Sequence, residues 1–480
     1  MDIKSLKDKI LQLAIQGKLI LQNESDEPAS ILLERITVEK EQLIKNKVIK
    51  KEKPLQKITD DEKLFELPNG WEWCRLGAIC KQITDGAHKT PKYVEKGVPF
   101  LSIKNISKGY FDFSDTKFIT EEEHNNLIKR CNPEENDLLF CRIGTLGKFK
   151  TIDFEPNFSI FVSLGLIKPF SDLNSKYLEI LLNSPMLYEQ YNEIKVDGSH
   201  TSKLNLGDIP NLLITIPPLE EQKRIVSKVE ELFELIDKLD NNKQDLLENI
   251  SNTRNKVLQL AIQGKLVKQC GNDEPARVLL EKIREEKEQL IKDKVIKKEK
   301  PLPEIIEEEK QFELPKGWEW CRLGEILSIT SGKNLTKKSM SENGTIPVYG
   351  GNGITGYHND YNVSEKTIVI GRVGFYCGSV HLTEEKAWVT DNAFITSYPK
   401  KFINREYLIM ILNAVNLKGS ESSTAQPVIS GKKVYPVIIP LPPLEEQKRI
   451  VAKVDLIMDY LDKLQQEIDS QEIILEDILQ

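Results

Sequence analysis

The sequence predicts two mixed α/β (α+β) domains, separated by long antiparallel coiled-coil helices and related by an internal pseudo-twofold repeat. Three observations support this fold class. Long stretches of the chain occur twice, apolar residues recur at heptad spacing in two places, and strand-like segments alternate with short apolar helices between the repeated stretches. A chain of 480 residues is also too long for one ordinary domain, so several domains are expected.

The repeat organises the whole chain. ELPNGWEWCRLG from Glu66 recurs as ELPKGWEWCRLG from Glu313, and about 49 of 68 residues match between 10–77 and 257–324. A second block, PPLEEQKRIV, starts at Pro217 and recurs with a different offset, and the stretches between the blocks share little sequence. Nearly identical frames around two divergent inserts favour one scaffold that presents two modules of different specificity.

The segment that follows each PPLEEQKRIV has the period of a coiled-coil helix, because its apolar residues are spaced by alternating steps of four and three, with a full heptad of seven in places. These residues are Ile225, Val229, Leu232, Ile236, Leu239, Leu246, Ile250, Val257 and Leu260 in the first copy, and Ile450, Val454, Ile457, Leu461, Leu464, Ile468, Leu475 and Ile478 in the second. Pro218 and Pro443 suit a helix start, and Gly264 suits a C-cap. About 45 residues of helix would span roughly 65–70 Å.

The head and the tail of the chain complement each other. The second helical copy stops before the portion LQLAIQGKL, and residues 2–19 supply that portion at the N-terminus. We therefore expect the central helix to pair antiparallel with a layer made from the C-terminal helix and the N-terminal segment. A generic dimerisation coil is the alternative, and the head-to-tail complementarity counts against it.

The repeated segments 26–53 and 273–300 are predicted to form further exposed helices. Asp26 and Asp273 are candidate N-caps, followed by a proline in the first turn. Each segment ends in a lysine-rich run. The simplest interpretation of these runs is a solvated helix end, and a site for phosphate or for a partner is the alternative.

Both inserts show the pattern of mixed α/β domains. Segments 97–103, 137–144 and 211–216 are strand-like in the first insert, and 366–374 and 434–440 are their counterparts in the second. The segments YLEILLNS (177–184) and YLIMILNA (407–414) are predicted to be short apolar helices in equivalent places. The two inserts thus share a plan while they differ in sequence.

Composition excludes several classes of protein. The 67 basic and 74 acidic residues give a net charge of −7, which argues against a simple basic nucleic-acid binder but leaves local basic surfaces possible. No apolar run is long enough to cross a bilayer, and MDIKSLKDKI lacks the features of a secretory signal. Seven cysteines without CxxC spacing and five scattered histidines predict neither a metal site nor a disulfide framework, so a reducing, cytoplasmic location is expected.

Polar clusters on glycine-containing loops are the candidate binding residues. Ser, Asn, His and Lys side chains on such loops can reach base edges and phosphates, although ordinary turn chemistry is the favoured explanation for any single one of them. Arg142 and Arg372 occupy similar strand contexts, which leaves a shared structural role open. The candidate DNA-contacting residues are Lys89, Lys104, Arg142, His200 and Lys203 in the first insert, and Asn352, His358, Arg372 and Ser422 in the second.

Signatures of catalysis are missing from the sequence. The segment 351–356 matches G-x-G-x-x-G, but the helix that dinucleotide binding requires does not follow it. The patterns of nucleotide triphosphate binding, of zinc peptidases and of serine hydrolases are absent, and Asn132-Pro133 is not followed by the aromatic residue of an amino-methyltransferase pocket. No catalytic residue and no metal ligand is therefore proposed, and the chain is expected to bind and position rather than to catalyse.

The order of these motifs resembles the DNA-specificity subunit of a type I restriction–modification system. The resemblance rests on the doubled GWEWCRLG and PPLEEQKRIV blocks and covers essentially the whole chain, and DGAHKTPKYVEKGVPFLSIKNI and TIPVYGGNGITGYH resemble target-recognition domains of that family. It implies the following organisation: 1–77, an N-terminal helical segment; 78–216, the first target-recognition domain; 217–323, a central helical region; 324–441, the second target-recognition domain; 442–480, a C-terminal helix.

The resemblance also implies a function and partners. Each target-recognition domain would bind one half of a bipartite, asymmetric site in double-stranded DNA, and the helices would set the distance between the halves. Two copies of a modification methyltransferase subunit, which would methylate adenine, and the restriction/translocase subunits would be the partners. S-adenosylmethionine, ATP and Mg would be bound by these partners and no cofactor by this chain. A non-catalytic coiled-coil adaptor that joins two protein-binding modules is the alternative.

Overall fold

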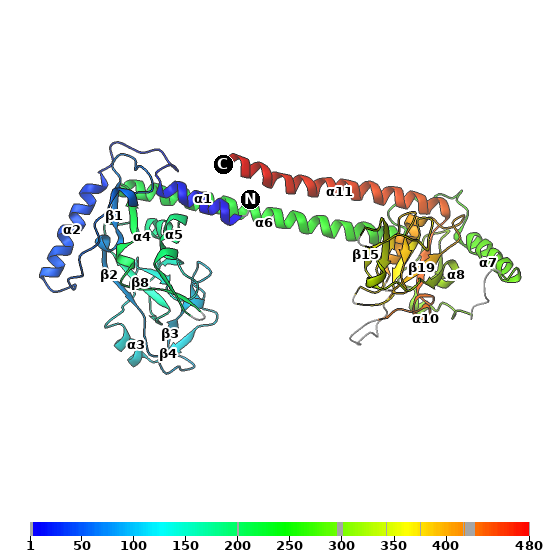
Figure 1. The fold of residues 1–480 in the computed structure, drawn as a ribbon, viewed down its shortest axis with the longest axis horizontal. Helices are drawn as coiled ribbons and strands as arrows, with labels where there is room; N and C mark the ends of the chain where they lie inside the picture. Colours follow the sequence, from blue (N-terminus) through cyan, green and yellow to red (C-terminus); the bar gives the residue numbers. More distant parts are fainter. Residues whose placement is uncertain are drawn as a thin grey trace. The chain divides into compact units, whose positions relative to one another are not determined.

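The structure is a computed structural model that describes residues 3–198, 201–294, 301–341, 343–374, 376–415, 417 and 428–479, with the backbone alone for 471–479. It divides into two compact units, Met1–Lys243 with Gln471–Gln480 and Gln244–Ser470. The long helix α6 (Leu219–Ile262) contributes residues to both units (Figure 1). No helix in the described part of the chain is long and apolar enough to cross a membrane.

In the first unit, helix α1 (Ile3–Ile15) packs antiparallel along the first part of α6. Lys7 Nζ lies 2.6 Å from Asp237 Oδ1 and over the ring of Phe233, near the start of α1. At the other end of α1, the Ile15 carbonyl accepts a hydrogen bond from Thr215 Oγ1, a few residues before α6 begins. The predicted antiparallel pairing of the N-terminal segment with the central helix is therefore confirmed.

In the second unit, helix α11 (Leu444–Leu479) packs antiparallel along the last part of α6. Ala261 and Ile450 share one apolar core, and Arg254 Nη2 lies 2.6 Å from Asp462 Oδ1. Gly264 follows the end of α6 with φ +66°, and Lys265 N donates to the Leu260 carbonyl, which confirms the predicted C-cap.

The helices α2 (Ala29–Lys45) and α7 (Ala276–Lys292) are equivalent in the two halves. The prediction that Asp26 and Asp273 cap them is wrong. The prolines at positions 28 and 275 stand at the N-caps, before the first turn, and make no side-chain cap. The aspartates instead pair with arginines of the long helices, because Arg224 Nη2 lies 2.6 Å from Asp26 Oδ2 and Arg449 Nη2 lies 2.6 Å from Asp273 Oδ2.

The repeated motif residues join each long helix to its β-domain. In the first copy Glu221 is buried in the first turn of α6, where its Oε2 accepts a hydrogen bond from Trp71 Nε1 at 3.1 Å and its Oε1 one from Gln22 Nε2 at 3.3 Å. Burial raises the pKa of the Glu221 carboxyl. Gln222 accepts from Asn174 N at 3.0 Å and donates to the backbone just before the helix.

The second copy repeats the glutamine interactions, whereas the buried Trp318 Nε1 has no hydrogen-bond partner among the described residues. Glu446 is buried and accepts a hydrogen bond from Gln269 Nε2 at 3.2 Å, and burial raises the pKa of its carboxyl. Gln447 accepts from Asn404 N at 2.8 Å and donates to Pro442 O at 3.0 Å. The near identity of the two frames therefore has a structural reason: the Glu and Gln of PLEEQKRIV join each long helix to its β-domain through equivalent hydrogen bonds.

The first β-domain contains two small sheets, which lie below the first part of α6 in Figure 1. A four-stranded antiparallel sheet has the order β2-β8-β5-β6, and a three-stranded mixed sheet has the order β4-β3-β7. Two strand pairs, β1-β11 and β9-β10, and three helices complete the domain. The bounds are β1 Glu72–Arg75, β2 Cys80–Asp85, β3 Val98–Leu101, β4 Lys117–Ile119, α3 Glu121–Leu127, β5 Leu138–Cys141, β6 Phe149–Thr151, β7 Ser159–Ile160, β8 Leu164–Pro169, α4 Ser175–Leu182, α5 Pro185–Ile194, β9 Lys195–Asp197, β10 Ser202–Leu204 and β11 Leu213–Ile216.

The second β-domain repeats this plan. Its four-stranded sheet has the order β13-β19-β16-β17, its three-stranded sheet the order β15-β14-β18, and β12 pairs with β20. The bounds are β12 Glu319–Arg322, α8 Leu323–Ile326, β13 Ser328–Ser331, β14 Ile346–Gly350, β15 Gly353–His358, β16 Ile368–Gly371, β17 Val380–Leu382, β18 Trp388–Val389, β19 Ala393–Ser397, α9 Arg405–Ala414, α10 Gly431–Val434 and β20 Ile438–Leu441. The two mixed α/β domains and the long helices predicted from the sequence are confirmed.

Candidate nucleic-acid interface

In the first β-domain, several loops meet at one end of the four-stranded sheet, around Val162 and Ser163. Arg142 N donates to Ser163 O at 3.0 Å, and Ile103 N donates to Ser163 Oγ at 3.3 Å. Val162 N donates to Ala87 O at 3.0 Å. These bonds bring the turns that follow β2, β3 and β5 together, although the turns are far apart in the sequence.

A buried carboxylate holds this end of the sheet. Asp85 ends β2 and its side chain is only 1% exposed. Arg142 follows β5, is 13% exposed, and its Nη1 lies 2.6 Å from Asp85 Oδ2. Oδ1 of Asp85 lies 3.1 Å from Arg130 Nη2 and 3.1 Å from His88 Nε2. A buried charge is tolerated where such partners compensate it, so this network positions the turns around it.

The network assigns Arg142 to the structure of the loops. Its Nε donates to Leu204 O at 2.9 Å, in addition to the ion pair with Asp85. A guanidinium that is bound on two sides and mostly covered is not free to reach a base edge. Of the two roles that the sequence left open for Arg142, the structural one is favoured.

The other described candidates of this domain lie on the surface of the same loops. Lys89 is exposed one residue after His88. Lys203 is exposed in β10, and its backbone forms an isolated β-bridge with Ile143, the residue after Arg142. Lys104 is exposed in the turn after β3, with its Nζ 2.5 Å from Asp115 Oδ2. Such an exposed ion pair is worth little and can be exchanged for a phosphate. Residue 200, the fifth candidate, lies outside the described residues.

The second β-domain carries the equivalent arginine without the carboxylate. Ser331 ends β13 as Asp85 ends β2, and each precedes a glycine at which a Cβ would collide with the neighbouring backbone. Arg372 follows β16, and its Nη1 lies 3.2 Å from Ser331 Oγ and 3.3 Å from Asp391 O. Its guanidinium also lies over the ring of Phe394, at 5.5 Å.

The remaining candidates of the second domain occupy two places. Asn352 is exposed in the turn between β14 and β15, next to Gly351, whose carbonyl accepts a hydrogen bond from Ser379 Oγ at 3.1 Å close to Arg372. His358 ends β15, with its ring 5.4 Å from that of Trp388, and its buried Nδ1 has no hydrogen-bond partner among the described residues. Residue 422 lies outside the described residues.

Sequence reasoning missed the residues that organise this end of each domain. Asp85 lies in a cluster that the sequence singled out, but Arg130 and Ser331 carry no local signal. The sequence also gave no reason to select exposed aromatic residues such as Tyr93, whose ring lies 4.3 Å from Lys117 Nζ. Arg130, Ser331 and Tyr93 are identified only by their contacts with residues that are distant in the chain.

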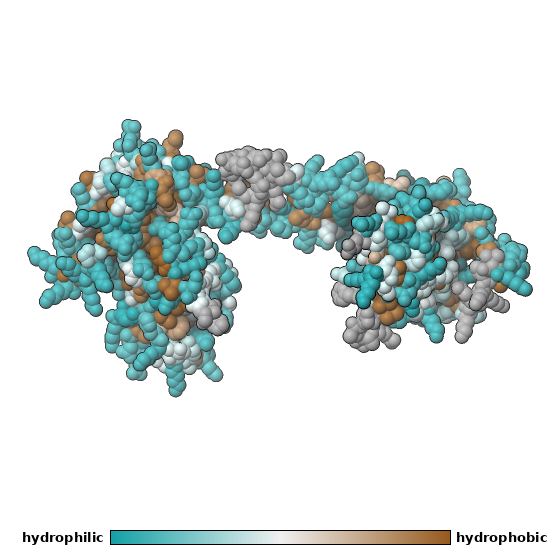
Figure 2. Space-filling view, in the orientation of Figure 1, coloured by the Kyte–Doolittle hydropathy of each residue, from teal (hydrophilic) through white to brown (hydrophobic). Residues whose placement is uncertain are grey.

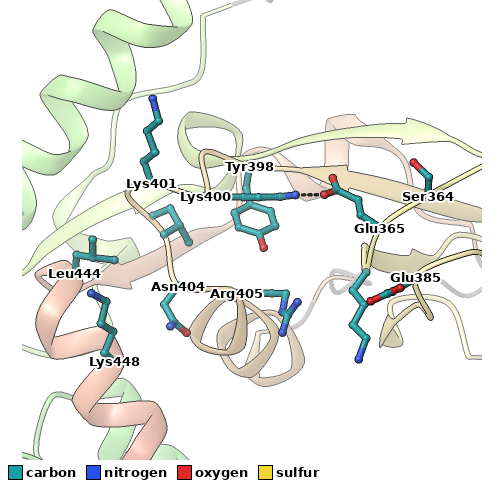
Figure 3. A pocket seen from close by; sticks show the side chains of 12 residues that line it. Ser364, Glu365, Glu385, Tyr398, Lys400, Lys401, Asn404, Arg405, Leu444 and Lys448 are labelled. Carbon is teal, nitrogen blue, oxygen red and sulfur yellow. Dashed lines mark hydrogen bonds and ion pairs between the residues drawn. The ribbon is translucent and has the colours of Figure 1, made fainter.

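A cleft of about 640 Å³ lies in the second unit between the β-domain and the first turns of α11 (Figure 3). Its cations are largely paired: Lys400 Nζ lies 2.6 Å from Glu365 Oε2, and Arg405 Nη2 lies 2.6 Å from Glu406 Oε1. Glu365 precedes β16, whereas Arg372 follows it. The cleft is therefore at the other end of that strand and is not part of the candidate interface. Among the described residues no cluster of His, Cys, Asp or Glu has the arrangement of a metal site.

Known proteins share this sequence and fold. The family model described as the type I restriction modification DNA specificity domain matches residues 68–249 and 315–475. The specificity subunit of the type I restriction enzyme EcoAI from Escherichia coli is 30% identical over 96% of this chain and 90% of its own length. That of EcoEI, also from Escherichia coli, is 30% identical over 98% of this chain and 91% of its own length.

Solved structures agree in fold. The HsdS subunit from Thermoanaerobacter tengcongensis matches with a TM-score of 0.52 and 20% identity, over 87% of this chain and 98% of that chain. A chain from a structure of the type I R-M system matches with a TM-score of 0.54 and 21% identity, over 86% and 97% of the two chains. The two matched regions each contain one β-domain, and on this evidence the chain belongs to the family of type I restriction–modification DNA specificity subunits.

Proposed function

We propose that residues 78–216 and 324–441 are two target-recognition domains, each of which reads one half of a bipartite, asymmetric site in double-stranded DNA. One observation carries this proposal. The frames that hold the two domains are nearly identical, whereas the loops at the Arg142 and Arg372 ends of the two sheets differ in sequence. One backbone plan with two sets of loop side chains is suited to reading two different base sequences.

Exposed loop side chains are the proposed DNA contacts. Lys89, Lys104 and Lys203 present ammonium groups to a phosphate or to guanine, and Asn352 presents an amide that suits adenine. His358 is included because its ring is partly exposed, and His200 and Ser422 because the sequence around them is rich in Gly, Ser and Thr. We assign Arg142 and Arg372 to positioning these loops.

The chain is a non-catalytic subunit, because family membership makes it a specificity subunit whose partners carry out catalysis. We propose that it directs DNA methylation and restriction by two copies of a modification methyltransferase subunit and by restriction/translocase subunits. These partners would bind S-adenosylmethionine, ATP and Mg. All seven cysteines are free thiols, which supports a cytoplasmic location.

A domain exchange tests this proposal. Residues 78–216 are replaced by the corresponding domain of a relative, and methylated adenines are mapped in cells that carry the hybrid and its modification subunit. One half of the methylated site should change while the other half stays the same. The reciprocal exchange of 324–441 is the matched control and should change the other half. A simultaneous change of both halves, or methylation without a defined site, would contradict the proposal.

A further inference from the structure

A run of lysines at the end of α2 stands out in a chain of net charge −7. Between positions 45 and 53 it contains five lysines and one glutamate, and we call it the lysine run: Lys45, Lys47, Lys50, Lys51 and Lys53. All five side chains are exposed. In Figure 1 this end of α2 projects from the edge of the first unit, and Figure 2 shows the same edge covered by hydrophilic side chains.

The lysine run has no acidic partner in the described part of the chain. None of its five ammonium groups lies within 4.0 Å of a carboxylate there, whereas other exposed lysines in the same unit are paired, such as Lys63 with Asp60 at 2.7 Å. The one glutamate of the segment, Glu52, lies 3.5 Å from Lys40 Nζ instead. The segment therefore presents positive charge that the fold does not use.

One lysine of the run occupies a strained backbone position. Lys47 has φ 58°, and its equivalent after α7, Lys294, has φ 57°. Only glycine, and to a lesser degree asparagine, adopts this conformation without cost. The chain uses glycine at the equivalent point after α1 and α6, where Gly17 and Gly264 have φ +68° and +66°. A lysine therefore stands in both halves where glycine would be less strained.

All five lysines of the run recur at equivalent positions in the second copy, where Asp293 replaces Asn46. KVIKKEKPL occupies 47–55 and recurs at 294–302, whereas an exposed position of the preceding helices differs, as with Val38 and Glu285. The two β-domains would read different bases, so a ligand common to both halves must be independent of base sequence. The phosphate backbone of DNA and two copies of a modification subunit both meet this condition, and the phosphates carry the complementary charge.

The helix dipole accounts for only part of the run. Cations are favoured at the C-terminus of a helix, but the effect falls off within the last turn. It can explain Lys45 and Lys47. It does not reach Lys50, Lys51 and Lys53, which follow the helix in a segment without regular secondary structure.

We infer that the lysine run binds DNA phosphates outside the bases that the loops read, and so contributes affinity that is independent of sequence. The inference rests on the proposed function, because it needs the DNA that the β-domains bind. Phosphate contacts of this kind position a protein on the duplex without selecting a sequence. An acidic surface on a protein partner is the competing occupant, and the experiment separates the two.

The experiment uses the complex of the full chain with its modification subunits. In one variant all five lysines become glutamine, and in the matched control all five become arginine, which keeps the charge. Affinity is measured between about 50 and 200 mM salt for a duplex that contains the methylated site and for one of equal length that lacks it. The glutamine variant should bind both duplexes more weakly by the same factor, and its slope of log K against log salt should fall by about 0.9 for each phosphate that the variant no longer neutralises. The arginine variant should behave as the wild type.

Three results would overturn the inference: an unchanged salt slope, a weakening confined to the specific duplex, or failure of the glutamine variant to assemble with the modification subunits in light scattering. The last result would assign the run to a protein partner. Failure of the proposed function is distinguishable from all three, because the wild-type complex would then show no preference between the two duplexes.

Discussion

Arg142 Nη1 lies 2.6 Å from Asp85 Oδ2, and this ion pair ties the end of β5 to the end of β2 in the first β-domain. The second domain keeps the arginine, Arg372, but pairs it with the hydroxyl of Ser331 at 3.2 Å. The same backbone junction is thus held by a buried ion pair in one domain and by neutral acceptors in the other. Loops of different sequence can be supported on one scaffold because this junction stays in place.

Replacing Arg142 with alanine should destabilise the first domain. It leaves the Asp85 carboxylate buried with only Arg130 and His88 as partners, so the expected loss is about 3 kcal/mol. Arg372→Ala should cost only about 1–2 kcal/mol, because neutral hydrogen bonds are removed and no buried carboxylate is left behind. Urea unfolding followed by hydrogen exchange of each domain measures both. Asp85→Ser, which reproduces the second domain's pairing, should lower the cost of Arg142→Ala. Equal losses at both arginines would show that the buried Asp85 carboxylate adds nothing, and no loss at Arg142 would contradict its structural role.

The sequence predicted the scaffold far better than the site. Repeats and heptads can be read directly from the sequence, so they located α6 and α11 within a few residues. The N-caps at Asp26 and Asp273 failed because arginines of distant helices compete for those carboxylates. Arg142 was selected as a DNA contact because its loop context fits one. Its actual partner, Asp85, lies 57 residues away and only the folded sheet brings the two together.

Lys89 and Lys203 should contact DNA directly, since both are exposed on the loops around Ser163 and have no carboxylate partner among the described residues. Alanine at either position should cost about 1–3 kcal/mol of binding if a base is contacted, and should relax one position of the site. If a phosphate is contacted, the salt slope should fall by about 1 without a change in specificity. Binding titrations against single-base variants of the site separate these results. Unchanged affinity and specificity in both variants would remove these residues from the interface.

The buried glutamates Glu221 and Glu446 should make stability depend on pH. Burial raises the pKa of each carboxyl in the folded state above its value of 4.5 in the unfolded chain, so folding favours the protonated form. The stabilisation from protonation is present below pH 4.5 and disappears as the pH rises through the folded pKa. Glu221→Gln keeps an acceptor for Trp71 and removes the buried charge. The variant should therefore melt above the wild type at pH 7, and the difference should shrink toward pH 4.5.

Glu446→Gln is the matched variant in the second copy and should behave in the same way. Thermal melting of both variants from pH 4.5 to pH 8 provides the comparison. Lower melting temperatures than the wild type at neutral pH would mean that the ionised carboxylates stabilise the junction, through the nearby Arg224 and Arg449.

Lys47→Gly should separate stability from binding in the lysine run. Glycine relieves the φ of 58° after α2, so the variant should gain about 0.5–1 kcal/mol of stability. It should at the same time neutralise one phosphate fewer and lower the salt slope by about 0.9. Lys47→Asn, which tolerates the same conformation and also lacks the charge, should give the same lowered slope. A variant that gains stability and keeps the full salt slope would show that Lys47 does not contact DNA.

The length of α6 should set the distance between the two half-sites, because α6 contributes residues to both units and each unit contains one β-domain. The boundary between the units falls after Lys243, in the polar stretch Asn241–Lys243, where an insertion disturbs the apolar seam least. Four added residues keep the helix close to register, since one turn takes 3.6 residues, and they lengthen it by about 6 Å. With about 3.4 Å per base pair, the spacer between the half-sites should grow by about one or two base pairs. Both half-site sequences should stay the same, because neither β-domain is touched.

Two added residues rotate the helix by about 200° and should abolish methylation, which makes this variant the matched control. Mapping methylated adenines in cells with each variant gives the readout, and an unchanged spacer in an active four-residue variant would mean that the helices join the domains without measuring the DNA.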